Sequence, residues 1–115
     1  MAAIPETEAG FQGWVIDLAK HHGWLVAHFR PAQMRSGRWA TLMMGDPGFP
    51  DLVLARRGRV IFAELKKEDG AVKPSQRRWL EELGEYGGLG DTLVGVYDVF
   101  VWRPSDRPTI EKVLA

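Results

Sequence analysis

Apolar and polar residues in the first part of the chain predict a helix followed by a strand. Beyond Glu8, apolar residues recur at the spacing of an amphipathic helix. Gly23 is expected to stop this helix in a left-handed conformation. The apolar run Trp24–Phe29 then predicts a short buried strand, in which His28 is expected to pack rather than to bind phosphate. The apolar positions of the helix are Phe11, Trp14, Val15, Leu18 and Ala19.

Two apolar runs in the middle of the chain predict a β-hairpin. Leu52–Ala55 and Val60–Leu65 are separated by the turn sequence Arg56–Arg59. Both alternate faces of these runs are apolar, so we expect the hairpin to lie inside a covered sheet. The preceding segment Arg30–Gly48 is interrupted by glycine and proline. It predicts a long loop, and a loop of this length in a small domain is usually functional or disordered.

The last part of the chain predicts two more helices with a strand between them. Pro74 suits the first position of a helix that ends at Gly84 or at the glycine cluster beginning with Gly87. A strand is expected within Thr92–Trp102, and Asp106 can cap a short terminal helix. The order of helix, strand, hairpin, helix, strand and helix predicts an α/β fold with a small mixed sheet flanked by helices.

The composition is that of one globular domain. The chain has 115 residues, no cysteine, and 15 basic and 15 acidic side chains. This length supports a single domain, and the lack of cysteine excludes disulfides and thiolate metal sites. No apolar stretch approaches the ~18 residues of a membrane span, and the first residues lack a signal-peptide pattern. We therefore expect a soluble cytoplasmic protein that does not enter a membrane.

The charge is unevenly distributed, although its sum is zero. Residues 20–78 contain 12 basic and 5 acidic side chains, whereas both flanking segments are net acidic. Such asymmetry suggests a cationic face that tracks a phosphate backbone, and a solvated mixed surface is the alternative. The candidate nucleic-acid contacts are Arg30, Arg35, Arg38, Lys67 and Lys73.

The register of the predicted hairpin brings two carboxylates together. A turn centred on Arg57–Gly58 places Asp51 directly opposite Glu64, with Lys66 on the same face. Carboxylates this close destabilise each other unless they share a proton or a cation. Two hard oxygen ligands suit Mg²⁺, and a neighbouring lysine can orient the water that attacks a phosphodiester. The alternative is a surface ion pair of Lys66 on an exposed strand.

Five segments resemble one nuclease family when they are taken in chain order. They cover nearly the whole chain and resemble the virus-type replication-repair nuclease (VRR-NUC) domains of the PD-(D/E)XK nuclease superfamily. A PD and ExK pair alone would arise often by chance, whereas five ordered segments are specific. The segments are Glu8-x-x-Phe11-Gln12-x-x-Val15, Gly48-Phe49-Pro50-Asp51, Glu64-Leu65-Lys66, Pro74-x-Gln76-x-x-Trp79-Leu80 and Val101-Trp102-Arg103-Pro104-Ser105-Asp106.

The resemblance implies a restriction-endonuclease-like fold and a metal site. The implied fold is a helix, a three-stranded meander, a helix and a strand, here followed by a short terminal helix. In the implied site Asp51 and Glu64 bind Mg²⁺, for which Mn²⁺ is expected to substitute, and the Leu65 carbonyl is a further ligand. Glu8 would hold a metal-bound water or a second ion.

The resemblance also assigns two residues that act beside the metal. Lys66 matches the catalytic lysine, and Gln76 matches the glutamine that completes the site from the second helix. One departure concerns the start of that helix, where Lys73 precedes Pro74 in place of a small hydroxylated cap.

The expected function is that of an endonuclease that hydrolyses DNA. The family suggests selectivity for junctions or flaps, including Holliday junctions, in replication, repair or recombination, within a bacterial or virus-infected cell. The alternative is a catalytically inert module that binds nucleic acid or scaffolds a complex. Five tryptophans and the apolar stretch around Trp39 and Met43–Met44 exceed what one small domain readily covers, so we expect a homodimer.

Overall fold

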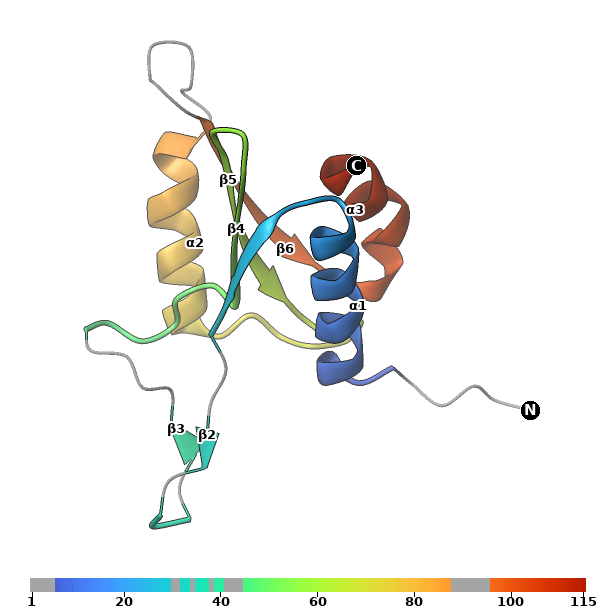
Figure 1. The fold of residues 1–115 in the computed structure, drawn as a ribbon. Coiled ribbons are helices and arrows are strands. Elements are labelled where there is room, and N and C mark those ends of the chain that lie inside the picture. Colours follow the sequence, from blue (N-terminus) through green and yellow to red (C-terminus); the bar gives the residue numbers. More distant parts are fainter. Residues whose placement is uncertain (1–5, 30–31, 34, 38, 41–44, 88–95) are drawn as a thin grey trace.

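The computed structural model describes residues 6–29, 32–33, 35–37, 39–40, 45–87 and 96–115. These residues form three α-helices, six strands and one turn of 3-10 helix (Figure 1). In chain order the elements are α1 (Glu8–His21), β1 (Leu25–His28), β2 (Ala32–Gln33), β3 (Trp39–Ala40), β4 (Leu52–Arg56), β5 (Arg59–Leu65), α2 (Pro74–Gly87), β6 (Val96–Trp102), η1 (Pro104–Asp106) and α3 (Arg107–Leu114).

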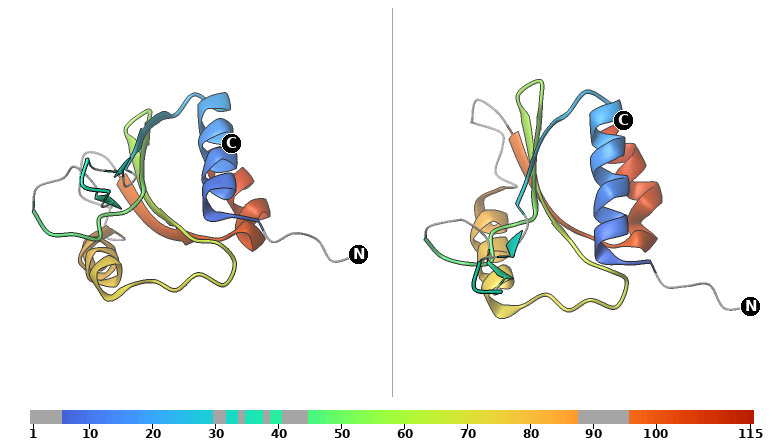
Figure 2. Two further views of the ribbon diagram at one scale, coloured as in Figure 1. Left: turned by 90° about the horizontal axis from the view of Figure 1, so that it is seen from below. Right: turned by 60° about the horizontal axis from the view of Figure 1, so that its bottom comes forward.

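Four strands form a mixed sheet in the order β1-β4-β5-β6. β1, β4 and β5 are antiparallel neighbours, and β6 runs parallel to β5. Helices α1 and α3 lie on one side of this sheet and α2 lies on the other (Figure 2). The predicted fold class, a mixed sheet flanked by helices in the order helix, meander, helix, strand and terminal helix, is confirmed.

The hydrophobic core lies between the sheet and the helices α1 and α3. Alternate residues of β4 and β5 point to this side and are fully buried, as period-two alternation requires. Burying one such side chain contributes about 1.5–3 kcal/mol, so this layer dominates the stability of the fold. The strand residues in the core are Leu52, Leu54, Ile61, Ala63 and Leu65, and the helices add Phe11, Val15, Ala19, Ile110 and Leu114.

The opposite face of the sheet is only partly covered. Helix α2 packs against β6, and Val53, Val60 and Phe62 are half-buried. The prediction that the hairpin lies inside a covered sheet is therefore only partly right.

The first strand is also less buried than its apolar sequence predicts. β1 is an edge strand that pairs with β4, and Leu25 is 77% exposed. The physical reason is position. Helix α1 contacts β1 from the core side, whereas α2, on the other side of the sheet, packs against β6 at the far edge.

The hairpin register is the predicted one. Arg56 pairs with Arg59, and Leu52 pairs with Ala63. The two turn residues between the strands have φ angles of 52° at Arg57 and 80° at Gly58. Both lie in the left-handed region that a two-residue turn of type I′ requires.

Three smaller expectations are refined by the structure. The predicted loop Arg30–Gly48 contains a short hairpin in which β2 pairs with β3. Helix α2 continues through Gly84 to Gly87. Asp106 accepts a hydrogen bond from the Arg103 backbone N–H at 2.8 Å, so its carboxylate caps η1 rather than α3. None of the described helices is long and apolar enough to cross a membrane.

Candidate active site

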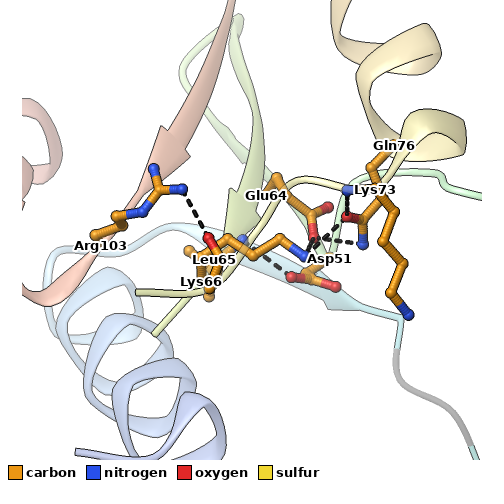
Figure 3. Close-up of polar contacts among 8 residues, drawn as sticks. Asp51, Glu64, Leu65, Lys66, Lys73, Gln76 and Arg103 are labelled. Carbon is orange, nitrogen blue, oxygen red and sulfur yellow. Dashed lines mark hydrogen bonds and ion pairs between the residues drawn. The ribbon is translucent and has the colours of Figure 1, made fainter. Parts of the chain in front are cut away.

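Asp51 and Glu64 lie at the same end of neighbouring strands, as the register predicts. Asp51 directly precedes β4, and Glu64 is the penultimate residue of β5. The Leu65 backbone N–H donates a hydrogen bond of 2.9 Å to Oδ2 of Asp51, which fixes that carboxylate across the strands (Figure 3). Glu64 is 1% exposed and is therefore removed from water. The structure thus brings the two predicted carboxylates together.

The electrostatics of this pair follow from burial. Desolvation, and after it repulsion from the Asp51 carboxylate, raise the pKa of Glu64 from 4.5 to about 8, against the opposing effect of Lys66. Desolvation also raises the pKa of Asp51, against the Leu65 hydrogen bond and the neighbouring positive charges. Without a cation, the pair therefore retains a proton near neutral pH.

Lys66 lies on the same face as Glu64 and is itself buried. Its Nζ donates a 2.8 Å hydrogen bond to Oε1 of Gln76 and lies 3.5 Å from Oε1 of Glu64. Only 6% of the residue is exposed. The alternative of an ion pair on an exposed strand is therefore wrong, because both partners are inside the protein.

Gln76 joins the start of α2 to the catalytic candidates. Its Nε2 donates to Oε1 of Glu64 at 3.1 Å, and its Oε1 accepts from the Lys73 backbone N–H at 2.9 Å as well as from Lys66. The contact with Lys73 is one half of a capping box, in which the third helical residue caps the backbone before the helix. Gln76 thus supplies one half of the box, and the half that a hydroxylated residue would supply at position 73 is missing.

These residues line one side of a pocket of about 610 Å³. Glu8 enters it from the first turn of α1, whose start is capped by Thr7 accepting from the Gly10 N–H at 3.0 Å. The predicted basic residues Lys67 and Lys73 also line it. Residues from the first helix, the hairpin and the second helix therefore converge on one pocket.

Of the remaining predicted contacts, the structure describes only Arg35, which is not among the residues that line this pocket. Arg35 lies exposed in the turn between β2 and β3. Arg30 and Arg38 lie outside the described residues.

The donor set fits a small divalent cation. Oε2 of Glu64 is buried and has no hydrogen-bond partner in the described part of the chain. Among the described residues, no group of three His, Cys, Asp or Glu side chains is placed to hold an ion. Glu8 stays predicted to hold a metal-bound water or a second ion. Mg²⁺ is usually bound by one or two carboxylates, and water and substrate occupy its other coordination positions. The Leu65 carbonyl stays a predicted ligand.

Two neighbours of the carboxylates come from the end of β1, where the sequence predicts a packed histidine at His28 and no role for Phe29. His28 pairs with Leu52, the residue that follows Asp51, and its electrostatic effect lowers the pKa of Asp51. Phe29, the next residue, lines the pocket. The signal that finds both is the pairing of β1 with β4, because continuing that register by one step sets Phe29 opposite Asp51.

Comparisons of the chain with protein-family models, with curated proteins and with solved structures give no match. The chemistry of the pocket therefore rests on its own residues.

Proposed function

We propose that this protein is a divalent-metal-dependent endonuclease that hydrolyses DNA phosphodiester bonds, as the resemblance to VRR-NUC domains implies. The observation that supports it most strongly is the pairing of half-buried Asp51 with buried Glu64, whose Oε1 lies 3.5 Å from Nζ of the buried Lys66. Two like charges at this spacing lower the stability of the fold unless another interaction offsets their repulsion. Binding a cation supplies that interaction.

The side chains have separable roles in this proposal. Asp51 and Glu64 would hold Mg²⁺ or Mn²⁺, which supplies charge neutralisation at the phosphate and a more acidic bound water. Lys66 presents a positive Nζ to the pocket, where it orients the attacking water or a phosphate oxygen. Gln76 restrains both Lys66 and Glu64, and Lys67 and Lys73 attract the substrate backbone.

The finer expectations form part of the same proposal. We infer a structure-selective activity on junctions or flaps, in a cytoplasm where DNA is replicated or repaired. We also infer a homodimer, because a domain of this size offers little surface for duplex recognition and two sites on a twofold axis would address two strands.

The test is cleavage of single-stranded, duplex, flap and four-way-junction DNA with Mg²⁺, with Mn²⁺ and with chelator. Asp51→Asn and Glu64→Gln should abolish cleavage, while Glu111→Gln, which changes an exposed carboxylate on α3, should not. Full metal-dependent cleavage by both site variants would exclude the proposed site. Binding without cleavage by the wild-type protein would favour the inert binding module.

A further inference from the structure

An exposed aromatic ring borders the candidate active site. Among the described large apolar residues, Leu25 and Phe29 are the exposed ones, and Phe29 is 38% exposed. Phe29 also lines the pocket that holds the two carboxylates. Full burial of a phenylalanine side chain would stabilise the fold by ~1.5–3 kcal/mol, and the exposed part of this ring loses a share of that free energy.

Phe29 belongs to the same cross-strand row as the carboxylates. Its backbone N–H donates a 2.8 Å hydrogen bond to the carbonyl of Asp51, so the pairing of β1 with β4 continues to this position. Asp51 in turn follows the register that sets it opposite Glu64. Since adjacent strands lie about 4.8 Å apart, the ring lies about one strand from Asp51 and two from Glu64.

The ring is supported from one side by other aromatic residues. Phe29 meets Phe49 edge to face at 5.4 Å, and Phe49 meets Trp79 at 5.0 Å and Phe62 at 6.1 Å. This cluster restrains the ring while part of it remains accessible to the pocket. A restrained, partly exposed ring beside a phosphate site is a suitable platform for a base, because every nucleobase has a face that stacks on an aromatic side chain.

We propose that Phe29 stacks on an unpaired nucleobase next to the scissile phosphate. A base inside a duplex already has neighbours on both faces, whereas a base at a flap or branch point offers a free face. The inference rests on the proposed nuclease function and deepens it, since it names the nucleotide that the site selects. Phe29 is then a specificity-determining residue for DNA with an unpaired nucleotide at the cut.

The experiment combines variants of the ring with removal of the base. Phe29→Leu removes the aromatic face, Phe29→Tyr keeps it, and Leu25→Ala is the control for an exposed apolar residue on the same face of β1. Each protein is assayed with Mg²⁺ on a flap substrate whose cut has been mapped, and on the same substrate with an abasic nucleotide at either side of the cut.

Phe29→Leu is expected to lower kcat/KM only where the substrate carries the base that stacks on the ring. Phe29→Leu should lower kcat/KM roughly tenfold on the intact flap and have little effect on the substrate whose abasic nucleotide removes the stacking partner. Phe29→Tyr and Leu25→Ala should resemble the wild-type protein. An equal loss by Phe29→Leu on the intact and both abasic substrates would overturn the inference and leave the nuclease proposal standing.

A second measurement does not depend on cleavage. With chelator present, a 2-aminopurine base at the flap junction should lose fluorescence when wild-type protein binds, and should lose much less with Phe29→Leu. If the wild-type protein cleaves no substrate, the nuclease proposal fails, yet quenching that requires Phe29 would still support base stacking. Equal quenching by both proteins would overturn it.

Discussion

Neutralising Glu64 should remove a pH-dependent loss of stability from the metal-free protein. Burial and the neighbouring Asp51 raise the pKa of Glu64 from 4.5 to about 8 in the folded chain. A carboxyl whose folded pKa is raised contributes its full stability below the unfolded pKa, and that stability is lost as pH rises towards the folded value. Asp51, whose pKa is also raised, acts with the same sign.

The magnitude follows from linkage. One pKa unit corresponds to about 1.4 kcal/mol, so the whole shift from 4.5 to about 8 corresponds to about 5 kcal/mol of unfolding free energy. About 4 kcal/mol of this is lost between about pH 5 and about pH 8.5. This is a large part of the ~5–15 kcal/mol that stabilises a typical domain. Glu64→Gln lacks the titrating group, and its amide can keep accepting from Gln76 while donating towards Asp51. Its stability should therefore change much less over this range.

The assay is urea unfolding of the wild-type protein and Glu64→Gln in chelator at several pH values. Glu111→Gln, on the exposed face of α3, serves as the control and should follow the wild-type curve. Mg²⁺ should then restore stability to the wild-type protein at alkaline pH but not to Glu64→Gln. If the unfolding free energies of the wild-type protein and Glu64→Gln change equally with pH, ionisation of Glu64 beside Asp51 does not destabilise the fold, and the reasoning is refuted.

Four further results are expected. Lys66→Ala should lose most cleavage but retain metal binding, and calorimetry that finds a loss as large as in Asp51→Asn would contradict its role. DNA affinity should fall steeply between low and physiological salt, because the basic segment releases counterions, whereas a flat response would point to another kind of partner. Arg57→Asn should raise the unfolding free energy by about 1 kcal/mol, since Arg57 has a φ of 52° that asparagine adopts more readily, and thermal unfolding would show it. Light scattering should find a dimer, and a mass near 12.9 kDa at micromolar concentration would exclude one.

Local rules predict much of the site because its centre is a hairpin. The turn fixes the register, and the register alone sets Asp51 opposite Glu64. Gln76 was assigned from the family resemblance, but its second role as the cap of α2 depends on where the helix starts in space. Predicting the positions of these residues depends on one pair of strands and on one helix boundary, both of which are local in the sequence.

The features that the sequence did not predict depend on longer-range packing. The exposure of β1 could not be read from its apolar run, because the run is short and the position of α2 decides which part of the sheet is covered. Phe29 was missed for the same reason, since its place beside Asp51 requires the pairing of β1 with β4 across the long segment between them. Alternation within a strand assigns faces but does not say which face has a neighbour.

The backbone hydrogen bond between Phe29 and Asp51 affects which changes of sequence the fold tolerates between these two residues. The 2.8 Å hydrogen bond between their backbones joins the two ends of residues 30–50, so that segment leaves the sheet and returns to it at one point. The entropic cost of a closed loop grows only with the logarithm of its length. Between Phe29 and Asp46, segments of different length and composition can therefore be exchanged at small cost to the fold. Phe49, which packs on Phe29 and Trp79, and the fully buried Pro50 have to be kept. The position beside the pocket is thus a natural place for evolution or engineering to graft new recognition elements onto an unchanged sheet.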